Sequence, residues 1–215
     1  MTKVTVVEEI MGANEQIADQ NRRLLDEKGI VTVNLMASPG AGKTSLTVST
    51  IEALRSQVRI GAIEGDTASQ VDADRVATAG VPVVQINTGG GCHLDAPMVR
   101  HALEQLPLDE IDLLIIENVG NLICPVGFAL GERVNVVIAS VPEGDDKPYK
   151  YPGIFSAVDA VVINKTDLLP YLDFDVPAFR QLIAGLNPEA RIFELSCKTG
   201  EGVEEWAEWL AGMCS

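Results

Sequence analysis

The fold follows from the stretch Ala37-Ser38-Pro39-Gly40-Ala41-Gly42-Lys43-Thr44. The apolar run before it, residues 31–36, predicts a strand, and Ser45 to Leu54 has the spacing of a helix. A glycine-rich turn between a strand and a helix is typical of a phosphate-binding P-loop, because backbone N–H groups and the helix N-terminus attract anions. Lys43 would then reach the β- and γ-phosphates, and the Thr44 hydroxyl would bind Mg²⁺. The stretch therefore predicts a nucleoside triphosphate site.

The predicted P-loop contacts are Pro39, Gly40, Ala41, Gly42, Lys43, Thr44 and Ser45. One departure is Ala37, which stands where the usual pattern has glycine and which resists a positive φ. A glycine-rich loop that binds nothing is the alternative, and the Gly-Lys-Thr sequence at this offset after a strand disfavours it.

Size and charge limit the domain organisation and the partners that the chain can have. The chain has 215 residues, of which 47% are hydrophobic and 22% charged, as in one compact α/β domain. We expect a single domain over residues 1–215, with an N-terminal helix in 1–29 and a nucleotide-binding core in 30–215. A net charge of −15 repels phosphate backbones and disfavours nucleic acid as a partner. With no signal-peptide pattern and no apolar run of about 20 residues, we expect a cytoplasmic protein that has no membrane partner.

Alternation of strand and helix patterns predicts the architecture. Apolar residues at wide spacing (Ile10, Ile17, Leu24, Leu25) predict a long helix from Val6 to Lys28 that Gly29 ends. Continuous apolar runs indicate strands that are covered on both faces. We therefore expect a three-layer α/β/α P-loop fold with a mostly parallel sheet of about seven strands. The strand candidates are Val31–Met36, Val58–Ile63, Val81–Ile86, Leu113–Ile116, Val134–Ala139, Ala160–Ile163 and Arg191–Leu195.

Asn164-Lys165-Thr166-Asp167 indicates which base is bound, because it directly follows a predicted buried strand. The Asp167 carboxylate can accept hydrogen bonds from guanine N1–H and the exocyclic amine, a donor pair that adenine lacks. We expect the Lys165 stem along the base and the Asn164 amide against the P-loop. After the last strand, Ser196-Cys197-Lys198 would offer a backbone N–H to guanine O6. The set favours GTP over ATP; a helix-capping Thr-Asp and a small-molecule P-loop kinase are the alternatives.

The γ-phosphate side is predicted from a strand that ends in an acid, Glu117, with Gly120 three residues later. Glu117 would hold Mg²⁺, and the Gly120 N–H would meet the γ-phosphate, as in GTPase switch segments. Asp66 and Asp72 follow the second strand and are candidates for a second switch segment, in which Asp72 would bind Mg²⁺. A helix N-cap at Asp66 and a solvated helix face at Asp72 are the alternatives. Because Asn121 stands in place of a water-orienting glutamine, we expect slow intrinsic hydrolysis.

A metal site is predicted from Gly89-Gly90-Gly91-Cys92-His93 together with Cys124. Adjacent residues face one ion only in a turn, which the glycines permit. Thiolate and imidazole suit Ni²⁺, Zn²⁺ or copper. Three ligands leave a four-coordinate ion one short, and a symmetric dimer could close the site. Buried structural cysteines, with a histidine capping a helix near residue 94, are the alternative.

Together these motifs resemble the hydrogenase nickel-incorporation GTPases, the HypB type of metallochaperone. The resemblance covers nearly the whole chain through ASPGAGKT, EGDTASQVDADR, NTGGGCHLDAPMV, ENVGNLICP, VPEGDDKPYKYP, NKTD and SCKTG. It implies a SIMIBI-class GTPase that dimerises on binding GTP, with metal ligands at Cys92, His93 and Cys124. The implied Mg²⁺ and switch carboxylates are Asp66, Asp72 and Glu117. Residues 143–152 resemble the family's dimer loop, from which Lys150 would reach the facing subunit's nucleotide; a solvated lysine is the alternative.

Two features separate this chain from relatives. The urease nickel GTPase, UreG, has Cys-Pro-His where this chain has Cys92-His93. Many HypB-type proteins also carry an N-terminal Cys-x-x-Cys-Gly-Cys site or a histidine-rich tract, whereas this sequence begins Met1-Thr2-Lys3-Val4 and has two histidines. We therefore expect the metal function to rest on Cys92, His93 and Cys124.

The resemblance leads to one functional expectation. GTP and Mg²⁺ would close a dimer, and hydrolysis would displace Cys124 and release Ni²⁺ to a HypA-like carrier or to the hydrogenase large-subunit precursor. The alternatives are a urease-type nickel GTPase and a GTP-gated dimerisation module that Zn²⁺ bridges.

Overall fold

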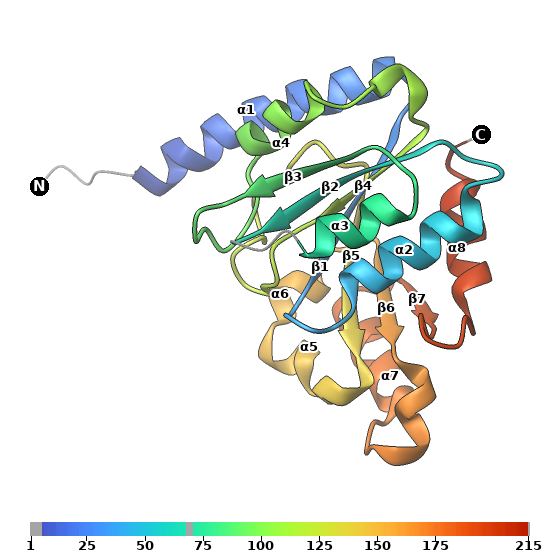
Figure 1. Cartoon of the computed structure of the whole chain (residues 1–215). Helices are drawn as coiled ribbons and strands as arrows, with labels where there is room; N and C mark the ends of the chain where they lie inside the picture. The colour runs from blue at the N-terminus through green and yellow to red at the C-terminus, as the bar shows by residue number, and fades with distance from the viewer. Residues whose placement is uncertain (1–5, 68–70, 215) are drawn as a thin grey trace, which may run out of the picture.

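The computed structural model describes residues 6–67 and 71–214 as a sheet between two layers of helices (Figure 1). Its seven strands are all parallel and lie in the order β3-β2-β4-β1-β5-β6-β7. This confirms the three-layer P-loop fold predicted from the sequence. The strands are β1 (Val31–Ala37), β2 (Ile60–Asp66), β3 (Val83–Asn87), β4 (Leu113–Glu117), β5 (Val134–Ser140), β6 (Ala160–Asn164) and β7 (Arg191–Glu194).

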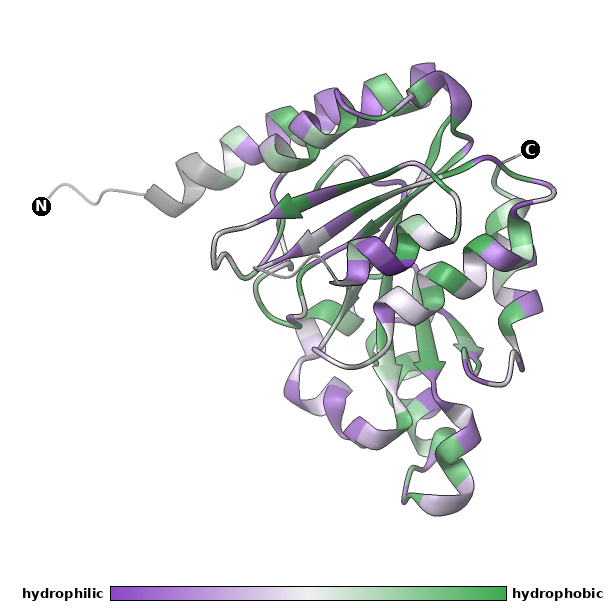
Figure 2. Ribbon diagram, viewed as in Figure 1, coloured by the Kyte–Doolittle hydropathy of each residue, from purple (hydrophilic) through white to green (hydrophobic). Residues whose placement is uncertain are grey.

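The helices account for the two outer layers. They are α1 (Val6–Glu27), α2 (Lys43–Leu54), α3 (Val71–Thr78), α4 (Ala96–Leu103), α5 (Lys147–Lys150), α6 (Pro152–Phe155), α7 (Val176–Leu186) and α8 (Val203–Ala211). On one face of the sheet α2, α3 and α8 share a core with the strands. On the other face α1 and α4 pack at the β2–β4 side, and α6 and α7 pack at the β5–β6 side. Both faces are thus covered, which explains the largely apolar colour of β5 and β6 in Figure 2.

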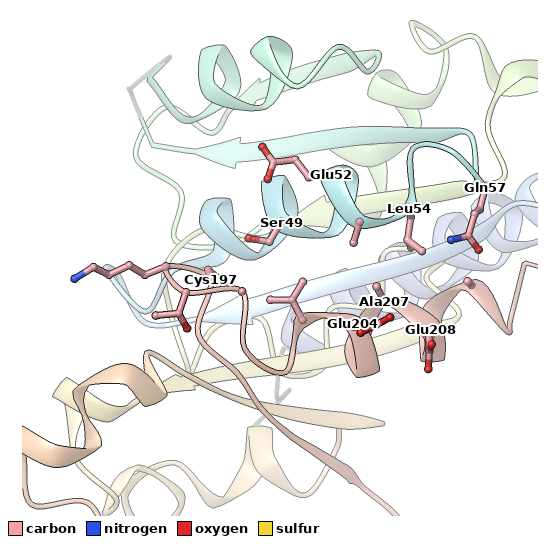
Figure 3. Close-up of a pocket in the computed structure, with 14 residues that line it drawn as sticks. Ser49, Glu52, Leu54, Gln57, Cys197, Glu204, Ala207 and Glu208 are labelled. Atoms are coloured by element: carbon pink, nitrogen blue, oxygen red, sulfur yellow. The ribbon is translucent and has the colours of Figure 1, made fainter.

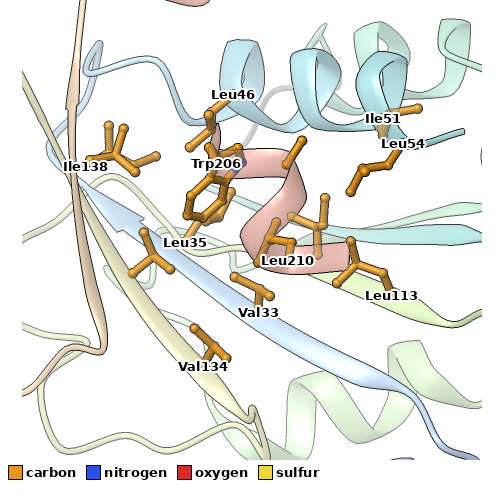
Figure 4. Packing of buried hydrophobic residues seen from close by; sticks show 14 of the residues in the cluster. Val33, Leu35, Leu46, Ile51, Leu54, Leu113, Val134, Ile138, Trp206 and Leu210 are labelled. Atoms are coloured by element: carbon orange, nitrogen blue, oxygen red, sulfur yellow. The ribbon is translucent and has the colours of Figure 1, made fainter. Parts of the chain in front are cut away.

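The largest core joins the P-loop helix to the C-terminal helix (Figure 4). Trp206 of α8 is 1% exposed and lies edge-on to Phe193, with ring centroids 5.4 Å apart. Its indole Nε1–H donates a hydrogen bond to Thr50 Oγ1 of α2 at 2.9 Å. Since α2 begins at Lys43, this packing fixes the direction in which the helix N-terminus points.

Because all strands are parallel, every predicted nucleotide-binding loop lies on the side of the sheet where the strands have their carboxyl ends. Strand β1 lies centrally between β4 and β5, so the chain winds in opposite directions on its two sides. Ligands of doubly wound sheets bind at the carboxyl ends of the strands next to such a reversal. The P-loop follows β1, and the loops after β2, β4, β6 and β7 carry the other candidates. Within the described residues, no helix combines the length and apolar character that a membrane span requires.

The turn before α8 leads to a prediction about stability. Gly202 has φ +72°, and a Cβ there would lie 2.1 Å from the Glu194 carbonyl oxygen. We expect Gly202→Ala to lower the free energy of unfolding by about 2–4 kcal/mol, through positive φ and a backbone clash. Gly185, in α7, serves as the control, because a Cβ added there would meet no heavy atom within 4 Å. Gly185→Ala should raise stability by about 0.5–1 kcal/mol. Urea unfolding measures both, and equal effects would contradict this account.

Candidate nucleotide and metal sites

The P-loop backbone has the turn geometry that its glycines allow. Gly40 and Gly42 adopt φ +80° and +104°. A Cβ on Gly42 would lie 2.4 Å from Nδ2 of Asn164, the last residue of β6, so the P-loop requires glycine at this point. Ala37 ends strand β1 in extended conformation and is fully buried, and its position therefore needs no glycine. Alanine in place of the usual glycine at position 37 therefore leaves the conformation of the turn unchanged.

The predicted base-binding residues converge on this turn. Asn164 Nδ2 donates to the Ala41 carbonyl at 3.0 Å, and Lys165 Nζ donates to the Gly40 carbonyl at 2.6 Å. Lys165 itself has a left-handed φ of +63°. Ser196 is buried, and its hydroxyl donates to Asp167 Oδ1 at 2.6 Å, so that Ser196 fixes the carboxylate. The Lys198 N–H and the Thr199 N–H both point to Ser196 Oγ, and the Cys197 N–H points to Asn164 Oδ1.

A cavity of about 280 Å³ lies at the phosphate end of the P-loop. Five predicted catalytic residues line it: Lys43, Asp66, Asp72, Glu117 and Gly120. The sixth, Thr44, donates from Oγ1 to Glu117 Oε2 at 3.1 Å. A Cβ on Gly120 would lie 3.0 Å from Pro39 Cγ, so the segment after β4 rests directly on the P-loop. The structure thus brings together residues that are up to 81 positions apart, between Pro39 and Gly120.

Glu64 belongs to this cavity and was missed by the sequence analysis. The register of β2 and β4 pairs Glu64 with Glu117, and the two residues are 3% and 2% exposed. Burial, followed by the charge and hydrogen bond of Glu117, raises the pKa of Glu64 to about 10. Burial also raises the pKa of Glu117. Glu64 is therefore the carboxyl group of this pair that carries a proton at neutral pH.

Both carboxyl groups leave one buried oxygen, Oε1, without a hydrogen-bond partner. Unpaired buried oxygens cost free energy unless a cation or a donor reaches them. Carboxylate and hydroxyl oxygens are the ligands that Mg²⁺ prefers. The donor set around Thr44, Asp72 and Glu117 therefore fits Mg²⁺, with Glu64 beside it.

The paired carboxyls predict a pH effect. The folded-state pKa of Glu64 is about 10, against an ordinary value of 4.5. The folded state then binds more protons, so its stabilisation is complete below pH 4.5 and is lost as the pH rises toward 10. We expect Glu64→Gln, which mimics the protonated group, to raise the stability of the ligand-free protein at pH 8 by about 1–3 kcal/mol. Chemical denaturation at pH 6 and pH 8 measures this, and a variant no more stable than the wild type at pH 8 would contradict it.

The predicted metal ligands also meet in space. The ligand atoms of Cys92, His93 and Cys124 all lie within 4.8 Å of one another, and Cys92 Sγ is 3.6 Å from His93 Nδ1. Gly89 and Gly90 have φ +61° and +96° and supply the turn that lets adjacent side chains face one point. The alternative of a helix-capping histidine is not what the structure has, because Asp95 caps α4 through the Met98 N–H.

The neighbours of the cluster affect the Cys92 thiol and the His93 ring. The nearby Cys124 raises the pKa of the Cys92 thiol above its ordinary value, and burial adds to this. A bound metal ion would reverse this effect, because it takes up the thiolate form. The His93 ring lies against Phe128, with centroids 4.1 Å apart, and this contact orients the imidazole.

Two asparagines connect the cluster to the segment that rests on the P-loop. Asn118 is fully buried, and its Oδ1 accepts the Leu94 N–H at 3.0 Å. Asn121 Nδ2 donates to the Cys92 carbonyl at 3.3 Å, while its Oδ1 accepts the Cys124 N–H at 3.3 Å. The four residues from Asn118 to Asn121 therefore touch both metal-ligand segments and, through Gly120, the P-loop.

The segment that resembles a dimer loop lies against the other side of the P-loop. Ser38 Oγ donates to Glu143, whose second oxygen accepts from Ser140. Lys150 is exposed and forms an ion pair with Asp146 at 2.5 Å. In the single chain, Lys150 does not line the phosphate cavity. Its contact with a facing subunit therefore stays a prediction.

A larger pocket lies between α2 and α8 (Figure 3), and it shares no lining residue with the cavity at the P-loop. Its volume is about 750 Å³. Apolar residues such as Leu54 and Ala207 line it together with Glu52, Glu204 and Glu208, and Cys197 and Lys198 form its edge next to the base loop. None of the predicted phosphate or metal ligands lines it.

Fold and sites together define a P-loop nucleotide-binding protein that carries a Cys-His-Cys cluster next to the segment that follows β4. Residues 31–194 match the nucleotide-binding domain of the CobW/HypB/UreG family. The hydrogenase maturation factor HypB of Azotobacter vinelandii is 49% identical over 95% of this chain and 68% of its own length. The chain therefore belongs to the HypB family of hydrogenase maturation factors, which confirms the resemblance inferred from its motifs.

Solved structures agree with this assignment. HypB from Archaeoglobus fulgidus superimposes with a TM-score of 0.89 at 46% identity, covering 95% of this chain and all of that one. HypB from Helicobacter pylori, solved in complex with nickel, superimposes with a TM-score of 0.90 at 38% identity. That comparison covers 94% of this chain and 95% of the Helicobacter chain.

Proposed function

We propose that the chain is a GTP-hydrolysing nickel metallochaperone for hydrogenase maturation, in which hydrolysis drives metal release. Support comes from the names of its relatives, which are hydrogenase maturation factors, and from the nickel complex of the Helicobacter pylori protein. The Asp167 carboxylate, fixed by Ser196, supports guanine as the base. The Cys92, His93 and Cys124 cluster supports a soft transition metal as cargo.

One observation carries the proposed coupling: residues 118–121 touch the P-loop and both metal segments. Gly120 rests on Pro39, and Asn121 bonds both Cys92 and Cys124 through the backbone. A γ-phosphate at Lys43 would meet the Gly120 N–H and hold this segment in place. Loss of that phosphate frees the Gly120 segment, its movement breaks the Asn121 bonds that hold the two metal-ligand segments together, and Cys124 is displaced from Cys92 and His93. The cluster loses a thiolate, and Ni²⁺ is released.

The chemistry at the phosphates is mainly positioning and charge stabilisation. Lys43 and the N–H groups of the P-loop stabilise the charge on the β- and γ-phosphates. Mg²⁺, held by Thr44, Asp72 and Glu117, supplies further charge neutralisation when it is bound. Asp66, at the end of β2, orients the second switch. Since Asn121 binds the metal segments instead of orienting water, intrinsic hydrolysis is slow.

We also propose that the chain works as one G domain in a GTP-dependent homodimer. The predicted N-terminal helix and nucleotide-binding core act as a unit, because within the described residues α1 packs on the core through Leu25. Lys150, on the loop of residues 143–152, reaches the facing subunit's nucleotide. The partners that receive nickel are a HypA-like carrier and the hydrogenase large-subunit precursor, in the cytoplasm.

The test is to measure Ni²⁺ affinity and dimerisation side by side with GDP and with a non-hydrolysable GTP analogue. We expect the analogue to promote the dimer and to retain Ni²⁺, and GDP to weaken both. ATP and ADP analogues should have no such effect. If neither the Ni²⁺ affinity nor the extent of dimerisation changes with the nucleotide, the proposed coupling is wrong. If Zn²⁺ stays bound in every nucleotide state, the cluster is a structural bridge.

A further inference from the structure

Helix α1 contacts both segments that carry the metal ligands, and it does so through two asparagines. One segment runs from Cys92 into the start of α4 at Ala96, and α1 and α4 lie side by side (Figure 1). The other runs from Cys124 through Leu130. Asn14 Oδ1 accepts the Ala96 N–H at 2.8 Å, while its Nδ2 donates to the Ala129 carbonyl at 2.9 Å. Asn21 Nδ2 donates to the carbonyls of Ala96, at 3.0 Å, and Leu130, at 2.9 Å.

Each asparagine thus bridges the same two segments, two helical turns apart. Asn14 is 5% exposed and Asn21 is fully buried, on the face of α1 that also carries Ala18 and Leu25. Buried amides are rare without specific partners, because their desolvation costs free energy. A helix that only needed to cover the sheet would have apolar residues at these positions. The two amides therefore hold the segments in a defined relative position.

Close backbone packing makes this contact rigid. Gly131 has φ +103°, and a Cβ there would lie 2.6 Å from Asn21 Cβ and 2.9 Å from the Ala18 carbonyl. Any movement of α1 along its axis would therefore carry the Leu130–Gly131 backbone with it. Because Asn14 and Asn21 also bond Ala96, α1 holds the Cys124 segment and the Cys92 segment in one relative position.

We propose that Asn14 and Asn21 are positioning residues for the metal site, and that α1 is a clamp that sets the spacing between Cys124 and the Cys92–His93 pair. The inference rests on the proposed metal site. The three ligand atoms already lie within 4.8 Å of one another without an ion, so little rearrangement accompanies binding. Loosening the clamp adds that rearrangement to the cost of binding, and a partner that displaces α1 would lower metal affinity without touching a ligand.

The experiment compares Asn14→Ala and Asn21→Ala with Gln20→Ala in the full chain. Gln20 is exposed on the same helix and is the matched control. We expect Ni²⁺ affinity, measured by competition with a chromophoric chelator, to fall about 10-fold in each asparagine variant, the lower end of the effect of losing a group that bonds a ligand directly. GDP affinity should stay within about 2-fold, because the nucleotide loops keep their contacts. Co²⁺ should show weaker thiolate-to-metal charge-transfer absorption in both variants, and Gln20→Ala should match the wild type.

A conservative variant separates positioning from general destabilisation. Asn14→Asp keeps the acceptor for the Ala96 N–H and loses the donor to Ala129, so its Ni²⁺ affinity should lie between those of Asn14→Ala and the wild type. Should Asn21→Ala fail to fold, the two Asn14 variants still decide the question. Unchanged Ni²⁺ affinity in folded asparagine variants would overturn the clamp, while the proposed metal site would stand if Cys124→Ala still lost nickel. Retention of nickel by Cys124→Ala would overturn the site and the clamp together.

Discussion

Replacement of Lys43 by alanine is expected to lower the rate of GTP hydrolysis by about 10²–10³-fold, the usual effect of removing one preorganised positive group from a site of developing negative charge. Lys43 starts α2 and lines the phosphate cavity beside Glu117 and Asp72. Without its charge, these carboxylates would repel the phosphates. Phosphate release under saturating GTP measures the effect.

The control for this variant is Lys28→Ala. Lys28 follows α1 and forms an ion pair with Asp109 at 2.6 Å, away from the nucleotide loops. Removing it takes away a similar surface charge and should leave the rate within about 2-fold, since exposed ion pairs contribute little. A Lys43→Ala protein that hydrolyses GTP as fast as the Lys28→Ala protein would remove Lys43 from the catalytic set.

The second large effect is expected at Cys124. Cys124→Ala removes one of two thiolates from a cluster of three ligands, so Ni²⁺ affinity should fall by roughly 100-fold or more. GDP binding should persist, because Cys124 lies outside the phosphate cavity. Competition with a chelator gives the nickel affinity, and a fluorescent GDP analogue gives the nucleotide affinity.

Cys214→Ala is the matched control. Cys214 is also half-buried, but it packs against the core of α2 and α8, with Sγ directed to the Leu210 carbonyl. Its removal should leave nickel affinity unchanged. If both alanine variants bind nickel like the wild type, the metal lies elsewhere in the chain.

The sequence predicts the sheet well because its strands are covered on both faces. Each predicted strand overlaps an observed one, and the ends differ by up to three residues, as at β2, where the apolar run stops at Ile63 and the strand continues to Asp66. The motif residues after β1, β4, β6 and β7 also fall at strand ends, because a buried strand must turn at the surface. The local apolar pattern is therefore sufficient to predict those elements whose burial it determines.

Residues that depend on long-range pairing were missed. Glu64 looks like an ordinary strand residue until the β2–β4 register places it beside Glu117. In α1, the apolar pattern predicts the helix and includes Leu25 of its buried face, but it does not predict that Asn14 and Asn21 lie on the same face. An amide is buried only where distant backbone groups receive its hydrogen bonds, and no local spacing shows where those groups lie.

The bond between Trp206 and Thr50 gives the chain an optical reporter of its own. Both tryptophans of the sequence, Trp206 and Trp209, lie on α8, and the indole N–H of Trp206 is held by the helix that begins at the P-loop. Indole emission shifts when its hydrogen bond or its packing changes. Intrinsic fluorescence therefore follows events at the far end of α2 in the unlabelled protein, at wavelengths where the nucleotide itself is dark.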